Sequence, residues 1–223
     1  VAVPVIANTV VQNAGQTCSA GSRLLVERSI YDKVVGRVQE KFRTLQAGTP
    51  EMDLDLGPVI SAGQKKRIEG FFSRAAEKSI PVLAEGKIAM GVPEGGYFVA
   101  PRIYGPVPRS NELARDEVFG PVLSILPFED EADAIKLANG TEFGLMAGIW
   151  SKDGSRALRV ARQVKAGQVY INAYGAGGGI ELPFGGMKKS GHGREKGFEA
   201  LYEFSTLKTM IIVFHSAPES NRS

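Results

Sequence analysis

The only cysteine of the chain, Cys18, lies in the stretch QNAGQTCSAGSR, between Gly15 and Gly21. A cysteine becomes a nucleophile only as the thiolate, which needs an accessible and electropositive site. The backbone N–H groups of a glycine-rich turn supply part of that field, and the Cys18 N–H could hold an oxyanion beside the sulfur. Glycine also lets the backbone approach a ligand closely. The pattern suggests a catalytic thiol, and the alternative is a small buried packing residue.

Two other uses of a cysteine depend on histidines elsewhere in the chain. A cysteine–histidine hydrolase needs an imidazole beside the thiol, and the chain offers His192, between glycines in SGHGRE, and His215, near the polar end. This hydrolase stays an alternative. A metal site is not expected, because one cysteine and two widely separated histidines lack the spacing of a ligand set.

Composition narrows the class of protein. With 43% apolar and 23% charged residues among 223, the chain has the make-up of a globular protein with a substantial core. Its net charge of +3 is spread along the sequence, so neither nucleic acid nor a membrane surface is expected as a partner. One cysteine cannot form an intrachain disulfide, and no stretch approaches the roughly 20 apolar residues that span a bilayer. These features predict a reducing, cytoplasmic location.

Apolar strands alternate with amphipathic helices along most of the chain. The expected strands are 23–29, 121–128, 144–151 and 167–172, and the expected helices are 1–12, 31–45, 64–79, 130–139 and 154–164. The apolar face of the first helix is expected to include Val10 and Val11, and the inward face of the third to consist of Ile68, Phe71, Phe72 and Ala75. Residues 92–108 are rich in glycine and proline and are expected to form an irregular loop with short extended pieces. Strands joined by helices of about three turns predict an α/β fold with a parallel twisted sheet and flanking helices.

The end of the chain differs from the rest. TLKTMIIVF over 206–214 is strongly β-prone, and such a strand must be paired or covered. Addition to another subunit and burial in this chain's own sheet are both open. The polar stretch 215–223 is expected to fray. We therefore expect one α/β domain over 1–205, a C-terminal edge strand for oligomerisation over 206–214, and a polar tail.

Four motifs resemble the NAD(P)-dependent aldehyde dehydrogenases, in the family's order. VQNAGQTCSAGSR is similar to the catalytic-cysteine signature, and DEVFGPVLSILPF at 116–128 is similar to the E-x-F-G-P segment. LANGTEFGLMAGIWSKD matches the A-N-x-x-x-Y-G-L region, with Phe143 in place of the usual tyrosine. VYINAYGAGGGIELPFGGMKKSGHGRE matches an asparagine, a loop and then P-F-G-G-x-K-x-S-G-x-G-R-E. The resemblance favours the nucleophile role of Cys18 over the packing role.

The resemblance implies oxidation of an aldehyde to a carboxylate with NAD or NADP. The Cys18 thiolate would attack the carbonyl carbon, and the Cys18 N–H and a side-chain amide would hold the oxyanion of the thiohemiacetal. Hydride would pass to the nicotinamide, and a water activated by a glutamate would hydrolyse the thioester. The loop 173–182 is glycine-rich where many relatives carry bulky aromatic residues, so the small-molecule aldehyde is not specified.

The resemblance also assigns residues around the thiol. Glu117 would hold the hydroxyls of the nicotinamide ribose, and Phe119 would limit the positions of the nicotinamide ring. Lys188 and Ser190 would tie down the P-F-G-G turn. The loop positions expected around the substrate are Thr17, Ser19, Asn172 and Phe184. Among these, Asn172 would hold loops together by bonding backbone groups.

The resemblance covers part of the family's architecture. In the family, the glutamate base, the oxyanion amide and the dinucleotide-binding fold precede the catalytic cysteine. Here seventeen residues without a glutamate precede Cys18, and no G-x-G-x-x-G pattern occurs. We therefore expect a catalytic domain that lacks the N-terminal cofactor-binding domain, binds NAD or NADP poorly alone and is inactive alone. The family forms dimers and tetramers, which implies a homo-oligomer. A noncatalytic assembly module stays the alternative for the chain as it stands.

Overall fold

The computed structural model describes residues 2–175 and 179–214. Helix α1 (Ala2–Val11) opens the described chain and passes into the 3-10 turn η1 (Gln12–Gly15). Val10 and Val11 of its expected apolar face are buried. The helix therefore packs one face on the core and leads directly into the turn that carries Cys18.

A four-stranded sheet in the order β1-β6-β5-β3 forms the larger layer. Its strands are β1 (Arg23–Glu27), β3 (Val82–Glu85), β5 (Arg102–Tyr104) and β6 (Val122–Phe128). β1 and β5 lie parallel to β6 on either side, and β3 lies antiparallel to β5. Residues 122–126 of β6 are all buried, as expected for a central strand that is covered on both faces.

Two long helices cover this sheet. α2 (Tyr31–Thr44) buries Val35, Val38 and Phe42. α3 (Ala62–Glu77) buries the expected Ile68, Phe71 and Ala75, and leaves the expected Phe72 half-buried. Ser61 begins α3, because its hydroxyl accepts a hydrogen bond from the Gln64 N–H at 3.1 Å. The shorter elements nearby are η2 (Arg28–Ile30), β2 (Gln46–Ala47), η3 (Pro50–Met52), β4 (Lys87–Ile88) and α4 (Glu112–Arg115).

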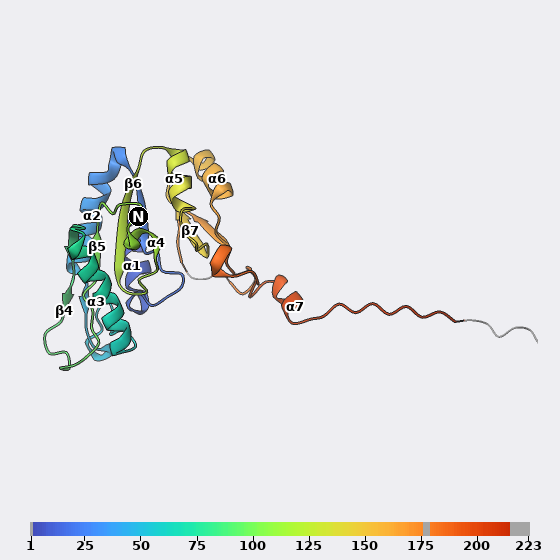
Figure 1. Cartoon of the computed structure of the whole chain (residues 1–223), viewed down its shortest axis with the longest axis horizontal. Coiled ribbons are helices and arrows are strands. Elements are labelled where there is room, and N and C mark those ends of the chain that lie inside the picture. Colours follow the sequence, from blue (N-terminus) through green and yellow to red (C-terminus); the bar gives the residue numbers. More distant parts are fainter. Residues whose placement is uncertain (1, 176–178, 215–223) are drawn as a thin grey trace, which may run out of the picture.

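A second, smaller layer follows β6. α5 (Glu131–Ala138) leads to β7 (Met146–Ile149), and α6 (Gly154–Gln163) connects β7 to its parallel partner β8 (Gln168–Ile171). Figure 1 shows α5 and α6 beside β7, on the side of the molecule away from α2 and α3. The α/β class is confirmed, but β7 and β8 form a sheet of their own among the described residues, and β3 makes the larger sheet mixed.

Residues 206–214 form no strand within this chain, so their burial in the chain's own sheet is wrong, and their addition to another subunit stays a prediction. After η4 (Lys188–Ser190) and α7 (Glu199–Glu203), residues 206–214 belong to no sheet. Figure 1 shows this segment running away from the folded body. Leu207 is 98% exposed and Phe214 is 90% exposed. A β-prone segment becomes a strand only against a partner edge, and 206–214 pair with no edge strand of their own chain. Residues 215–223 lie outside the described residues.

Candidate active site

Cys18 lies in a tight turn between η1 and β1. The Ala20 N–H donates to the Thr17 carbonyl at 2.9 Å, and the Ser22 N–H donates to the Ala20 carbonyl at 2.9 Å. Ser19 is buried beneath the turn, whereas the Cys18 thiol is exposed. The alternative of a buried packing cysteine is therefore wrong for the chain described here, and the thiol has the access that a nucleophile needs.

The two glycines that flank this turn serve protein packing. Gly15 has a φ of +74°, and a Cβ at this position would overlap the carbonyl of Gly120 and lie 2.6 Å from the nitrogen of Pro121. A Cβ at Gly21 would lie 2.8 Å from Thr9 Oγ1. The expectation that these glycines make room for a ligand is therefore corrected, because protein atoms occupy both spaces. Gly15 seats the cysteine turn on the segment that contains the E-x-F-G-P motif.

That segment lies between α4 and β6, and α3 holds it. Phe119 has a φ of +58°, a left-handed conformation that is costly for a residue with a side chain. The Gln64 Nε2 donates to the Phe119 carbonyl at 2.7 Å. The Arg67 guanidinium donates to the Glu117 carbonyl. The side chain of Glu117 is exposed, and that of Phe119 is half-buried.

Cys18 and Glu117 both line a large cavity of about 980 Å³. Its lining includes residues of α1, the cysteine turn, β1, the Glu117 segment, α5, β7 and α6. The other expected site residues, which do not line it, are Thr17, Ser19, Phe119, Asn172 and Phe184. His192 is exposed and does not line it either, while His215 lies outside the described residues. The described site therefore gives Cys18 no imidazole partner in this cavity.

Tyr174 also lines the cavity and was not among the expected site residues. A Cβ at Gly21 would lie 3.5 Å from its ring, so the ring packs beside the end of the cysteine turn. Burial raises the pKa of Tyr174 to about 12, with a smaller contribution from Tyr170. The phenol therefore stays protonated at neutral pH and can donate a hydrogen bond into the cavity. Its position as an aromatic residue in a glycine-rich loop was the signal that could have identified it. Residues 176–178 of that loop lie outside the described residues.

Asn172 joins two loops through the backbone. Its Nδ2 donates to the Ser151 carbonyl at 2.9 Å, and its Oδ1 accepts from the Ser151 N–H at 3.0 Å. Asn172 follows β8, and Ser151 lies just beyond β7. The asparagine has a φ of +53°, which its short amide tolerates better than most side chains. It thereby links the ends of the two strands of the smaller sheet.

The P-F-G-G turn is tied down by Lys188 and Ser190. The Lys188 Nζ donates to the Asn139 carbonyl at 3.0 Å and to the Thr141 carbonyl at 2.9 Å. Ser190 Oγ accepts from the Gly144 N–H at 3.0 Å. Burial lowers the pKa of Lys188, and the charges of Lys165 and Arg23 lower it further. Phe184 pairs through its backbone with Glu195, at 2.7 Å in both directions. Lys188 thus acts as an anchor for the turn.

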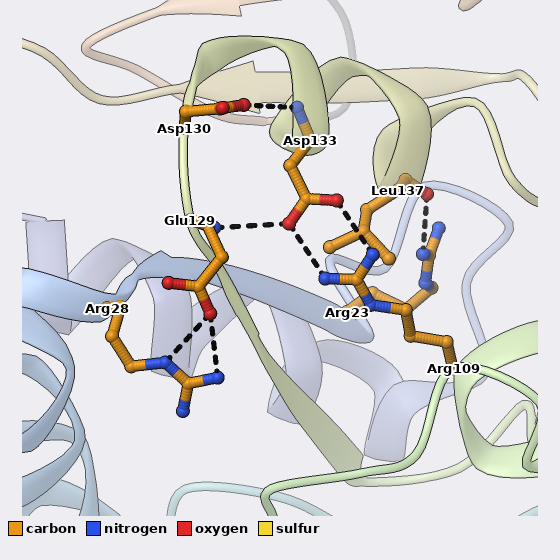
Figure 2. Close-up of polar contacts among 7 residues, drawn as sticks. All are labelled: Arg23, Arg28, Arg109, Glu129, Asp130, Asp133 and Leu137. Atoms are coloured by element: carbon orange, nitrogen blue, oxygen red, sulfur yellow. Dashed lines mark hydrogen bonds and ion pairs between the residues drawn. The ribbon is translucent and has the colours of Figure 1, made fainter.

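Arginines from three segments bind α5 or Glu129, two residues before it, and one of them, Arg23, lies in β1, the strand that follows the cysteine turn. Figure 2 shows Arg28 directed to the Glu129 carboxylate and the Arg23 guanidinium directed to the Leu137 carbonyl, the latter at 2.9 Å. Arg109 binds Asp133 with two hydrogen bonds of 2.7 Å. This ion pair holds the pKa of Asp133 below its usual range.

Comparisons with known proteins identify the family of this chain. The family model described as "Aldehyde dehydrogenase family" matches residues 1–210. A betaine aldehyde dehydrogenase of Sinorhizobium fredii is 37% identical over 202 residues, which make up 90% of this chain and 41% of that protein. The crystal structure of a candidate aldehyde dehydrogenase from Burkholderia cenocepacia is 54% identical with a TM-score of 0.91, covering 94% of this chain and 44% of that one.

A third relative was solved with a cofactor. The betaine aldehyde dehydrogenase of Staphylococcus aureus, in complex with NAD+, is 36% identical with a TM-score of 0.85, covering 91% of this chain and 40% of that one. No helix among the described residues is long and apolar enough to cross a bilayer. The chain spans 41% of the length of the first curated relative. Because the family model covers nearly all of this shorter length, the chain belongs to the aldehyde dehydrogenase family.

Proposed function

We propose that this chain carries the nucleophile and part of the cofactor-binding surface of an NAD(P)-dependent aldehyde dehydrogenase that oxidises an aldehyde to a carboxylate. The observation that supports this is the accessible Cys18 thiol, which lines one cavity of about 980 Å³ together with the carboxylate of Glu117. The resemblance of the surrounding motifs to the family supports the assignment. A reducing, cytoplasmic location suits a free catalytic thiol.

Cys18 forms the covalent bond in this proposal. Its thiolate attacks the aldehyde carbon, a carbon–sulfur bond forms, and the electron pair of the carbonyl moves onto oxygen. The Cys18 N–H is the donor that the turn offers to this oxyanion. Thr17 and Ser19 set the shape of the turn, because the Thr17 carbonyl closes it and Ser19 packs beneath it.

The exposed Glu117 carboxylate suits the hydroxyls of a nicotinamide ribose. It makes no hydrogen bond with the described residues, so both oxygens are free to accept from a diol. NAD or NADP, when bound, accepts the hydride from the thiohemiacetal carbon. Phe119, two residues later, limits the positions of the nicotinamide ring in this proposal. Asn172 and Phe184 hold the loops of the smaller sheet, from which Tyr174 reaches the cavity.

The chain alone is proposed to be inactive in turnover. Within the family, the hydrolytic glutamate and the dinucleotide-binding fold precede the cysteine, and the seventeen residues before Cys18 hold no glutamate. A thioester at Cys18 would then lack an activated water. Steady formation of reduced cofactor by the 223-residue chain with an aldehyde would contradict this part of the proposal.

Alkylation of Cys18 tests the nucleophile role on the chain itself. Iodoacetamide should label Cys18, as read by peptide mass spectrometry, and millimolar propionaldehyde should slow the labelling by reversible addition to the thiol. Cys18→Ser removes the signal and is the control for labelling at other residues. An alkylation rate that propionaldehyde leaves unchanged would refute an aldehyde-reactive thiol.

A second function, assembly, is favoured by the exposed C-terminal segment. Met210, Ile211 and Ile212 are 72%, 85% and 68% exposed. A second copy of this chain is the occupant we propose, because the β-prone residues 206–214 can add a strand to an open sheet edge of the other copy. Light scattering should show a dimer or tetramer for the chain and a smaller species after deletion of 206–214. An unchanged mass after deletion would refute this use of the segment.

A further inference from the structure

Helix α3 contacts both parts of the proposed site. Two residues before it begins, the Ile60 N–H donates to Gln16 Oε1 at 2.9 Å, which links the segment leading into the helix to the residue two positions before Cys18. One turn further, Gln64 and Arg67 donate to the carbonyls of Phe119 and Glu117. The helix lies outside the cavity, since none of its residues lines it. It is therefore placed to orient the site without touching the aldehyde.

The contacts of α3 with the Glu117 segment come from one face of the helix. Gln64, Arg67 and Ile68 stand at positions i, i+3 and i+4, which are neighbours on a helical surface. A Cβ at Gly120 would lie 2.8 Å from Ile68 Cγ1, so the helix also packs directly on the backbone there. Ile68 is fully buried. The segment thus packs on the buried Ile68 side chain and accepts hydrogen bonds from Gln64 and Arg67.

The Phe119 backbone needs such support. A residue with a side chain pays roughly 1–2 kcal/mol for a left-handed conformation, and Phe119 has a φ of +58°. Conformations of this kind persist where the surroundings over-determine them. The Gln64 amide, half-buried and 2.7 Å from the Phe119 carbonyl, fixes the peptide group that follows the strained residue. The Arg67 guanidinium fixes the Glu117 carbonyl two residues earlier.

We propose that Gln64 and Arg67 are positioning residues that act through these two carbonyls and set the placement of the Glu117 carboxylate and the Phe119 ring relative to Cys18. The proposal rests on the proposed function, in which Glu117 and Phe119 contact the cofactor. According to this proposal, the side chain at position 64 must carry an N–H donor that reaches the Phe119 carbonyl.

Hydrogen exchange on the 223-residue chain tests this positioning. Gln64→Met keeps the length of the side chain and removes the donor, and Gln64→Lys restores a donor. The Asp116 and Val122 N–H groups report on the segment, since they bond to the Glu112 and Gly120 carbonyls at 2.7 Å. We expect exchange at these amides to become about tenfold faster in Gln64→Met and to return toward the wild-type rate in Gln64→Lys.

Arg67 provides a second, independent pair of variants. Arg67→Met should speed exchange at Asp116, and Arg67→Lys should restore it. Lys66→Met is the matched control, because Lys66 is exposed on the same helix and makes no hydrogen bond with the described residues. The urea midpoint should change little in each variant, which separates local release from global destabilisation.

Three results would overturn the positioning role. These are unchanged exchange at Asp116 and Val122 in both methionine variants, equally faster exchange throughout β6 and α3, and failure of the lysine variants to restore protection. The measurement needs neither aldehyde nor cofactor. If propionaldehyde did not change the alkylation rate of Cys18, the proposed function would be refuted. The exchange measurement would still test the positioning role of Gln64 and Arg67.

Discussion

Replacement of Gly15 by alanine tests how the cysteine turn is seated. Gly15 has a φ of +74°, and an added Cβ would overlap the Gly120 carbonyl. The left-handed conformation costs roughly 1–2 kcal/mol for alanine. Overpacking against rigid backbone adds about 1–3 kcal/mol. We therefore expect Gly15→Ala to lower the free energy of unfolding by about 2–5 kcal/mol, or the melting temperature by about 4–20 °C for a protein of this size.

Alanine substitutions at two other glycines separate the conformational cost from the overpacking cost. Gly95 has a φ of +80° and open space around a Cβ, so Gly95→Ala should show only the conformational cost of roughly 1–2 kcal/mol. Gly36, inside α2, has open space and no positive φ, so Gly36→Ala should stabilise the chain by roughly 0.5–1 kcal/mol. Urea unfolding of the three variants checks the order. A loss in Gly15→Ala no larger than in Gly95→Ala would refute the proposed contact with Gly120.

Three further substitutions test the anchors around the site. Lys188→Met should lower the free energy of unfolding by about 2 kcal/mol in urea titrations, because two carbonyls lose a charged donor. Asn172→Ala should cost more than Asn172→Gly, since both lose the bonds to Ser151 and only alanine keeps the strain of a φ of +53°. Arg109→Met should destabilise at pH 7, and the gap to wild type should shrink in melts taken below pH 4, because Asp133 has a lowered pKa and its stabilisation is lost as pH falls through it. A gap that stays constant down to pH 2 would contradict the ion pair.

The sequence predicted those parts of the fold that have a strong periodic pattern. The buried face of α3 and the continuous apolar run of β6 are confirmed, because burial on one or both faces leaves a direct imprint on residue order. β3 was not predicted, since Val82–Glu85 is short and pairs antiparallel to a strand seventeen or more residues later. The segment 206–214 has the composition of a strand but forms none, because composition does not supply the partner edge.

The candidate site also has a part that the sequence predicted and a part that it did not. Motifs identified Cys18 and Glu117, and the structure places both on one cavity. The role of Gly15 could not be read from the sequence, because it depends on Gly120, more than a hundred residues away. The bond from Gln64 to Phe119 spans 55 residues and depends on how α3 packs. Long-range contacts of single side chains leave no periodic pattern along the chain.

The uncovered C-terminal segment has a consequence for how the chain behaves in the cell and in the test tube. TMIIVF at 209–214 contains no charge, no proline and no glycine, the composition of segments that stack into cross-β fibres. Lys208 is the one charged residue inside 206–214 and stands where a gatekeeper would oppose such stacking. We therefore expect the chain to aggregate through this segment until another molecule covers it, and we expect loss of the Lys208 charge to favour that aggregation.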